Sequence, residues 1–364
     1  MKQRIAFFLA SLRGGGAEKN VVNLANYFIE NGFNVDIVLV QETGPYLRDL
    51  HKNVRIIGLN KTRSIYSIFA LRMYLLEVNP DALLSHVIHI NLVTILAKLL
   101  LFKKIKTRIV ICSVNSLTAP IVKNGQVKLI HIAQLKLITF LYSLADGIIF
   151  SSKAAMTEAF SYKSSLQNRS ICIYNPVVTD SMIEYSSNRA PYEKITFVAA
   201  GRLEEQKNFS LLINAFFIVK QSLDAQLIIL GEGSLRAKLV NQANELGLQN
   251  DISFIGFVDD LSSYMKRSDA FVLSSLWEGF GNVIAESLAL GVPVVSTDCP
   301  FGPSEILCDG KYGQLVPVNN VEALSVAMLK SINSPISKDE LVERSKDFLV
   351  DRIALQYQHY LLEV

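Results

Sequence analysis

The feature that most constrains the fold of this chain is an alternation, repeated along both halves, of short β-branched runs with longer amphipathic stretches. In the stretch Glu18–Asn31, for example, Val21, Leu24 and Phe28 share one helical face. Strands that alternate with helices in this way form parallel sheets. The runs that we interpret as strands are Ile5–Ala10, Val35–Val40, Val54–Leu59, Ala82–Ser85, Arg108–Val114, Gly147–Phe150, Ile195–Ala200, Gln226–Leu230, Ile252–Gly256, Ala270–Ser274, Pro293–Thr297 and Gly313–Val316. The sequence therefore predicts an α/β protein of two doubly wound domains.

The join between these domains is predicted near Asn175–Glu193. This segment contains Asn-Pro, several serines and Ala190-Pro191, and its apolar residues show no helical or strand periodicity. We expect an N-terminal domain over residues 1–180 and a C-terminal domain over residues 181–350. A last helical pattern, Lys338–Leu362, is longer than a final crossover needs. Its end, residues 351–364, is predicted to pack back on the N-terminal domain.

The composition excludes a disordered or fibrous chain, because 50% of the 364 residues are hydrophobic and only 19% are charged. The apolar runs Leu92–Ala97 and Leu99–Phe102 are separated by Lys98 and fall short of the roughly 20 residues that a membrane span needs. Met1–Leu12 resembles a secretion signal, but Arg13 and three glycines follow where a cleavage site belongs. We expect neither a transmembrane helix nor a secretion signal.

The net charge of +3 conceals an asymmetry between the two halves. Residues 1–180 hold 21 Lys and Arg and 10 Asp and Glu, which gives +11, whereas residues 181–364 hold 15 and 23, which gives −8. The excess cations point to an anionic partner of the N-terminal half. The four cysteines lack the spacing of metal ligands and indicate reduced thiols in a cytosolic protein.

The first glycine-rich turn, Gly14–Gly16, lies between a strand and the helix that begins near Glu18. Glycines at this place let a phosphate or a sugar approach the backbone and the helix N-terminus. The pattern differs from GxGxxG, because Lys19 stands where the last glycine belongs. A tight turn without a ligand is an equal alternative on this loop alone.

The loop after the first strand of the second half carries two cations, Arg202 and Lys207, before a helix. Arg202 can bind diphosphate oxygens in a bidentate manner and Lys207 adds a point charge, although a solvated charge pair would also fit. Further along, Glu278 and Glu286 stand on either side of a glycine-rich turn, eight residues apart. The amides of Gly281, Asn282 and Val283 would then be free donors at a helix N-terminus, which suits an anion.

These pieces resemble the family 4 glycosyltransferases, retaining enzymes of the two-domain Rossmann-like GT-B fold, along nearly the whole chain. The matching segments are Gly15–Glu18, Gly201–Asn208, Leu230–Gly233, Phe254–Val258, Glu278–Glu286 and Leu290–Val295. The resemblance implies two Rossmann-like domains that face each other across a cleft. It also implies transfer of a hexose or N-acetylhexosamine from a nucleotide sugar, with UDP-sugars favoured, to a hydroxyl of a lipid-linked or cell-surface glycan.

The resemblance also implies the roles of particular residues. Arg202 and Lys207 would bind the diphosphate, Glu278 the sugar and Glu286 the ribose hydroxyls. The loop Gly256, Phe257 and Val258 would surround the base, and Gly15 and Gly16 would lie near the donor. No Asp-x-Asp motif of metal-dependent transferases is present, and the adjacent Asp259 and Asp260 are expected to cap the next helix, so we expect no metal and no cofactor beyond the donor.

One departure concerns a histidine that many relatives carry after the strand Ile109–Val114, where this chain has Asn115. Asparagine can hydrogen-bond a hydroxyl but cannot take a proton at neutral pH. His86 and His89, in the preceding loop, could substitute, and some relatives that act on lipid-linked sugars carry residues like His89 and Asn91. A polar residue that caps a helix remains the alternative for each of them.

The excess cations of the N-terminal half lie among apolar residues, in the segments Lys98–Arg108 and Lys123–Tyr142. Lysine stems over apolar surface suit an anionic membrane, whereas sparse arginine and the lack of interleaved aromatic residues argue against nucleic acid. Buried helices with solvated rims are the alternative. We expect a cytoplasmic protein, bacterial in type, that associates peripherally with the inner face of the cell membrane, where polysaccharides and lipopolysaccharides are made.

Two other functions stay open at this point. A GT-B-fold binding or scaffold protein without catalysis would explain Asn115, and a Rossmann-type NAD-dependent oxidoreductase would use the first glycine turn. The oxidoreductase needs a proper GxGxxG motif and an acidic residue for the ribose, and both signals are poor here. The favoured function is therefore that of a metal-independent glycosyltransferase.

Overall fold

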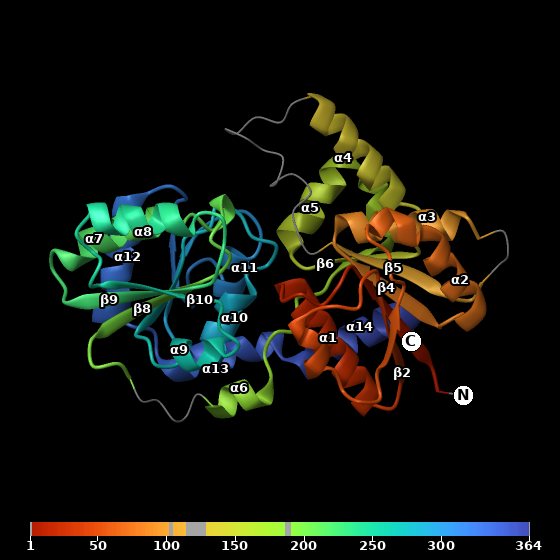
Figure 1. Ribbon diagram of the computed structural model, residues 1–364, viewed down its shortest axis with the longest axis horizontal. Coiled ribbons are helices and arrows are strands. Elements are labelled where there is room, and N and C mark those ends of the chain that lie inside the picture. The colour runs from red at the N-terminus through yellow and green to blue at the C-terminus, as the bar shows by residue number, and fades with distance from the viewer. Residues whose placement is uncertain (1, 102–104, 114–128, 186–190, 364) are drawn as a thin grey trace. The chain divides into compact units, whose positions relative to one another are not determined.

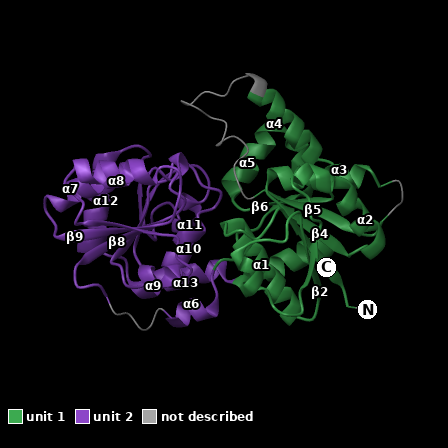
Figure 2. Ribbon diagram, viewed as in Figure 1, with its two compact units in different colours: residues 1–177, 350–364 green, residues 178–349 purple. Residues whose placement is uncertain are grey.

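The computed structural model describes residues 2–101, 105–113, 129–185 and 191–363. These residues form two compact units, unit 1 over residues 1–177 and 350–364 and unit 2 over residues 178–349 (Figure 2). Each unit is built on one parallel sheet with helices packed against it (Figure 1). The expected α/β architecture of two doubly wound sheets is confirmed.

The sheet of unit 1 has the strand order β3-β2-β1-β4-β5-β6-β7. Its strands are β1 (Arg4–Leu9), β2 (Asn34–Leu39), β3 (Arg55–Gly58), β4 (Ala82–His86), β5 (Arg108–Ser113), β6 (Gly147–Phe150) and β7 (Ser170–Cys172). The first six match the runs expected from the sequence to within a residue or two. The edge strand β7 was not expected, because its three residues are only half-buried and carry little apolar pattern.

Helices cover both faces of this sheet (Figure 1). Alternate residues of β1 separate the two layers: Phe7 packs in a core with α1 (Gly16–Glu30), and Phe8 packs in a core with α2 (Ile68–Val78) and α3 (Ile88–Leu99). The remaining helices of unit 1 are α4 (Leu129–Tyr142), α5 (Lys153–Tyr162), α14 (Val350–Leu362) and the short 3-10 turns η1 (Pro45–Asp49), η2 (Ser64–Ser67) and η3 (Ser164–Arg169).

Helix α14 belongs to unit 1, although it follows all of unit 2 in the sequence. It lies in the same core as α1, where Tyr357 is 1% exposed and its hydroxyl is 3.8 Å from the Cys112 sulfur. The backbone N–H of Ile148 donates to the Tyr360 hydroxyl at 3.0 Å. A Cβ atom at Gly147 would stand 2.8 Å from that hydroxyl, so a larger residue there would force the Tyr360 ring to shift. The end of the chain therefore completes the core of unit 1.

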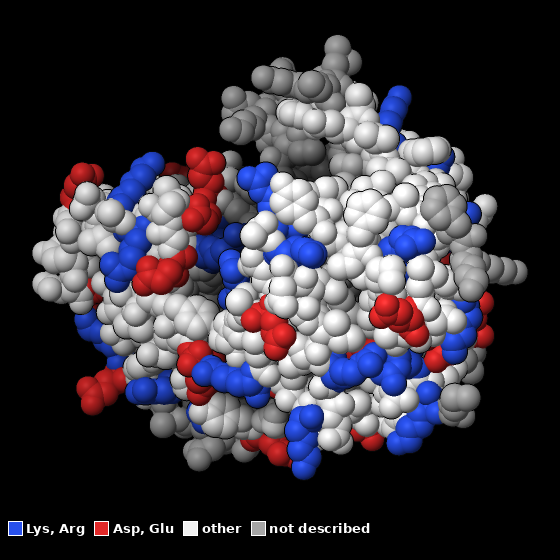
Figure 3. Space-filling view, turned by 45° about the vertical axis from the view of Figure 1, so that its right-hand side comes forward, with Lys and Arg blue, Asp and Glu red and all other residues white. Residues whose placement is uncertain are grey.

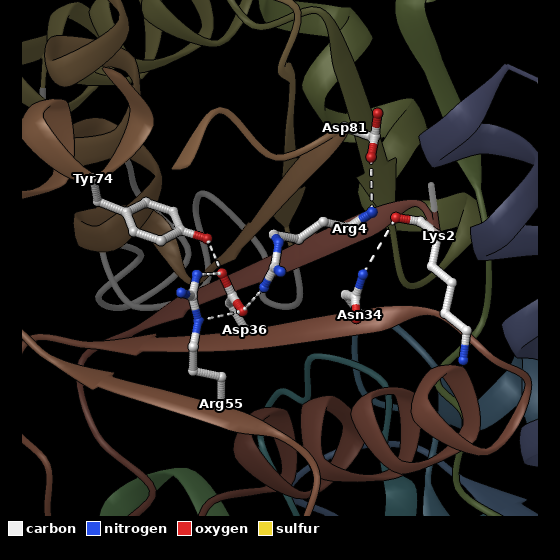
Figure 4. Close-up of polar contacts among 7 residues, drawn as sticks. All are labelled: Lys2, Arg4, Asn34, Asp36, Arg55, Tyr74 and Asp81. Atoms are coloured by element: carbon white, nitrogen blue, oxygen red, sulfur yellow. Dashed lines mark hydrogen bonds and ion pairs between the residues drawn. The ribbon is translucent and has the colours of Figure 1, made fainter. Parts of the chain in front are cut away.

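A buried carboxylate ties together the amino-terminal ends of three neighbouring strands of unit 1 (Figure 4). Asp36 of β2 has a fully buried side chain and accepts from Arg4 of β1 at 2.6 Å, from Arg55 of β3 at 2.9 Å and from the Tyr74 hydroxyl of α2 at 2.7 Å. Burial and the neighbouring Asp36 carboxylate raise the pKa of Tyr74. This network lies at the end of the sheet opposite the carboxyl ends of the strands. We therefore interpret it as stabilising the fold of unit 1.

The sheet of unit 2 has the strand order β10-β9-β8-β11-β12-β13. The strands are β8 (Ile195–Ala200), β9 (Ala225–Leu230), β10 (Ile252–Gly256), β11 (Ala270–Leu273), β12 (Val294–Thr297) and β13 (Gln314–Val316). Each overlaps a run expected from the sequence. The helices are α6 (Asp180–Tyr185), α7 (Phe209–Lys220), α8 (Arg236–Glu245), α9 (Leu261–Met265), α10 (Asn282–Ala289), α11 (Pro303–Leu307), α12 (Val321–Asn333) and α13 (Lys338–Ser345), with the 3-10 turns η4 (Glu205–Lys207) and η5 (Lys346–Phe348).

Two local expectations can be compared with unit 2. Asp260 caps α9 as expected, because its carboxylate accepts from the Ser263 N–H at 3.1 Å. The prediction of one helical stretch over Lys338–Leu362 was wrong. Helix α13 and turn η5 end before Leu349, and α14 starts after it. Leu349 itself has an extended backbone that pairs with Val178. The break falls where the chain passes from unit 2 to unit 1. Across the described ranges, the helices are too short or too polar to span a bilayer.

Candidate functional site in unit 2

Two loops of unit 2 lie side by side because they follow the neighbouring strands β8 and β11. Their backbones are joined by a hydrogen bond of 2.8 Å from the Leu276 N–H to the Gln206 carbonyl. The Gln206 side chain in turn donates to the Trp277 carbonyl at 2.9 Å. The carboxyl ends of parallel strands are where open α/β sheets bind ligands. The two loops are therefore the natural place for a site in this unit.

A buried ion pair connects these loops. The Lys207 ammonium lies 2.7 Å from Oε1 of Glu278, and the two side chains are 15% and 8% exposed. The hydroxyl of Ser275, which is itself fully buried, donates to the same oxygen at 2.5 Å. Glu278 is thus held through Oε1 by two donors, one from each loop.

The residues behind this pair were not identified from the sequence. Ser275 is held by Thr297 of β12, whose hydroxyl donates to the Ser275 carbonyl at 2.6 Å. Cys299 is 2% exposed, and its burial together with the Glu278 carboxylate raises the pKa of its thiol to about 12. The Ser-x-x-Glu spacing before the glycine-rich turn is the one sequence signal that could have pointed to Ser275.

Helix α10 begins next to Glu278. Gly281 precedes the helix with φ of +95°, a left-handed conformation that glycine adopts without strain. The first N–H groups of α10, from Asn282 and Val283, therefore lie at the helix N-terminus, as the spacing predicts. Glu286 is half-buried in the second turn of the same helix.

The carboxyl ends of β8, β9 and β10 approach each other closely through three glycines with positive φ. A Cβ atom at Gly231 would stand 2.0 Å from the Gly201 carbonyl oxygen, and the Gly231 N–H donates to the Gly256 carbonyl at 2.7 Å. Gly201 is also packed against the stem of Lys207. The carboxyl ends of these strands therefore require glycine at positions 201, 231 and 256.

The other residues of unit 2 that were expected to bind the donor also lie at the carboxyl ends of these strands. Arg202 follows β8 and is exposed, and Phe257, directly after β10, is 59% exposed while Val258 is half-buried. The structure thus pairs Lys207 with Glu278 directly and leaves Arg202 and the loop after β10 accessible to solvent.

The expected residues of unit 1 lie at the ends of β1 and β4. Gly15 precedes α1 and Gly16 is its first residue. The Glu18 carboxylate covers this turn, since its Oε2 lies 2.2 Å from the place of a Cβ atom at Gly15. A negatively charged group at Gly15 would therefore meet that carboxylate.

The polar residues after β4 differ in their surroundings. His89 is exposed on the first turn of α3. His86 is 1% exposed, its Nδ1 has no hydrogen-bond partner within the described part of the chain, and burial lowers its pKa to about 3. Asn91 is fully buried and bonded to Ser85 and to the Cys112 carbonyl, which is a structural role. Asn115 lies outside the described residues.

Comparisons with known proteins agree with this architecture. The family model "Glycosyltransferase Family 4" matches residues 14–181, and the model "Glycosyl transferases group 1" matches residues 183–348. The chain belongs to the family 4 glycosyltransferases and is a glycosyltransferase of GT-B fold. This identification decides against an NAD-dependent oxidoreductase.

Two relatives and two solved structures illustrate the similarity. The chain is 27% identical over 374 residues to a Campylobacter jejuni N-acetylgalactosamine-N,N'-diacetylbacillosaminyl-diphospho-undecaprenol 4-alpha-N-acetylgalactosaminyltransferase, covering 99% of this chain and 100% of the relative. It is 32% identical to an uncharacterised glycosyltransferase of Methanocaldococcus jannaschii, but covers only 64% of that relative, over 60% of this chain.

The solved structures share the fold at low sequence identity. The lipopolysaccharide outer core galactosyltransferase WaaB in its apo form has a TM-score of 0.76 at 19% identity and 99% coverage of both chains. Anabaena HepE in complex with UDP and glucose has a TM-score of 0.79 at 19% identity and full coverage of both chains.

Proposed function

We propose that this glycosyltransferase moves a hexose or N-acetylhexosamine from a UDP-sugar to a hydroxyl of a lipid-linked glycan, with retention of configuration and without a metal ion. The observation that carries the proposal is the buried Lys207–Glu278 pair at the carboxyl end of the unit 2 sheet. It supplies one cation for a diphosphate and one carboxylate for a sugar, from two adjacent loops.

Charge develops on the diphosphate oxygens when the bond between the anomeric carbon and the leaving group breaks. Arg202, Lys207 and the α10 amides of Gly281, Asn282 and Val283 stabilise this charge. Electrostatic stabilisation of this kind is usually the largest contribution to lowering the activation barrier. The Lys207 ammonium has three donors, so it can hold Glu278 and a phosphate oxygen together. No step requires a metal ion, because these cations and amides take its electrostatic role.

The other groups bind parts of the donor and the acceptor. Glu278 accepts a hydrogen bond from a sugar hydroxyl on Oε2, and Glu286 holds the ribose. The loop Gly256–Val258 surrounds the base. In unit 1, Gly15, Gly16, His89 and Asn115 bind the reacting sugar and the acceptor.

The names of the relatives and the charge of residues 1–180 support this acceptor class. The Campylobacter jejuni relative is named for an undecaprenol diphosphate acceptor, and WaaB is named for the lipopolysaccharide outer core. The cation excess of residues 1–180 suits such an anionic, membrane-bound substrate. We therefore place the protein peripherally on the cytoplasmic face of the membrane.

The proposal is tested in two stages. A thermal-shift panel of UDP, GDP, ADP and their sugars identifies the donor, because a ligand at 100 times its Kd stabilises a protein by about 2.7 kcal/mol. Release of UDP from the donor that binds is then measured with a lipid-linked acceptor. Lys207→Ala should abolish this release, whereas the matched variant Lys346→Ala, in an exposed ion pair of unit 2, should retain it. Tight binding of the donor without turnover by the parent protein would contradict the proposal.

A further inference from the structure

An exposed apolar ridge runs along η2 and α2 of unit 1. Ile65, Tyr66, Phe69 and Met73 recur at helical spacing and remain exposed, with Tyr66 at 58% and Phe69 at 71%. The opposite side of α2 is also apolar, because Leu71 and its neighbours are buried in the core. A helix that is apolar on both sides needs a second apolar partner besides its own core.

The ridge is part of a larger face. Helices α2, α3 and α4 each cross from one strand to the next in the same direction along the sheet, so right-handed connections place them on the same side. Eight large apolar side chains of unit 1 are exposed among the described residues, and seven of them lie on these helices and η2. Beyond the ridge, the three others are Leu99 of α3 and Leu137 and Phe140 of α4. We call this surface the α2–α4 face.

The charges on this face are mostly positive. Together, η2, α2, α3 and α4 carry three cations, Arg72, Lys98 and Lys136, and one acid, Glu77. Lys98 forms an ion pair with Asp146 at 2.6 Å, so Arg72 and Lys136 carry the positive charge of the helices. Arg63 lies directly before η2 and is exposed. Figure 3 shows a broad, mostly uncharged area with separate blue and red side chains across it. Apolar side chains with cations among them are complementary to an anionic lipid surface.

We propose that the α2–α4 face docks on an anionic membrane, with the η2–α2 ridge inserted at the level of the headgroups. The assignment rests on the proposed membrane-linked acceptor for its setting, whereas the surface is defined by unit 1 alone. A second copy of the chain fits less well, because a two-fold interface would bring the cations of both copies together. Peripheral binding of this kind keeps the acceptor lipid and unit 1 on one surface.

The test is flotation of the full-length protein with lipid vesicles. The parent should float with vesicles that contain phosphatidylglycerol, less in high salt, and poorly with phosphatidylcholine alone. The double variant Tyr66→Ser/Phe69→Ser should lower the partition coefficient about tenfold or more, and Arg63→Glu should lower it only at low salt. The matched control is Phe217→Ser, an exposed apolar position on α7 of unit 2, which should float like the parent.

Three results would overturn the proposal. The parent does not float with anionic vesicles, or the double variant floats as well as the parent. Alternatively, light scattering shows a dimer that the double variant dissociates, in which case a second copy covers the face. Melting temperature and the UDP-induced thermal shift verify that each variant is folded. A parent that floats but neither binds nucleotides nor transfers sugar would refute the proposed function and leave the docking surface standing.

Discussion

Replacing Lys207 by methionine would remove the cation from the buried pair and leave the Glu278 carboxylate without its partner. Glu278 would keep the Ser275 hydrogen bond, but its side chain is only 8% exposed. A carboxylate in this position loses its compensating charge and regains little hydration. We therefore expect Lys207→Met to destabilise unit 2 rather than to affect ligand binding alone.

The magnitude follows from the burial of both partners. Removing one member of a buried ion pair costs about 3–5 kcal/mol, and the remaining Ser275 contact places the expected loss at the lower end, about 3 kcal/mol. The pair Lys346–Glu343 is a matched control, because it has the same side chains in the same unit at 2.6 Å but is 47% and 73% exposed. Lys346→Met should cost less than about 1 kcal/mol.

Urea unfolding followed by tryptophan fluorescence measures this loss in unit 2. The chain has one tryptophan, Trp277, which is adjacent to Glu278, so its emission reports the unit that contains the pair. Circular dichroism on the same samples follows both units. The transition midpoints of parent, Lys207→Met and Lys346→Met give the comparison.

The double variant Lys207→Met/Glu278→Gln completes a thermodynamic cycle. It should be more stable than the sum of the single effects predicts, by about 2 kcal/mol, because no charge is left buried alone. If Lys207→Met were no more destabilising than Lys346→Met, or if the cycle gave no coupling, the buried ion pair described here would be wrong.

Three further predictions concern other buried groups. As the pH falls from 6.5 towards 3, unit 1 should lose stability through His86, because the unfolded chain takes up a proton that the folded imidazole resists. In urea titrations, His86→Phe should reduce the dependence of the unfolding free energy on pH by up to about 1.4 kcal/mol per pH unit. As the pH rises from 9.0 to about 12, unit 2 should weaken, because folded Cys299 retains a proton that the unfolded thiol loses; a Cys299→Ala variant with the same alkaline slope in Trp277 fluorescence would contradict this. Asp36→Asn should cost about 2 kcal/mol by circular dichroism, since its arginine partners are partly solvated, and a loss below about 0.5 kcal/mol would argue against the network.

The sequence was most informative where apolar periodicity is strong. The runs Ile5–Ala10 and Ile195–Ala200 correspond to β1 and β8 because each is buried on both faces and reads as a continuous apolar segment. Edge strand β7 lacks that signal. The break at Leu349 also carries no glycine or proline, and it arises where the chain changes units. Local patterns therefore predicted elements well and tertiary boundaries poorly.

The candidate site shows the same division. Lys207 and Glu278 could be singled out because each follows a strand in a loop with a helix behind it. Their ion pair could not be predicted, because the two residues are 71 positions apart and meet through the pairing of β8 with β11. The Thr297–Ser275 hydrogen bond depends on another tertiary pairing, that of β11 with β12, whereas the Ser275–Glu278 bond is local.

The placement of α14 in unit 1 has a consequence for the order of folding during synthesis. Unit 2 is continuous from residue 178 to residue 349, so all of its residues leave the ribosome before those of α14. Unit 1 emerges first but lacks the helix that supplies Tyr357 and Tyr360 to its core. The later half of the chain is therefore the first to become a finished domain, and the earlier half must wait beside it as a nascent chain with an incomplete core.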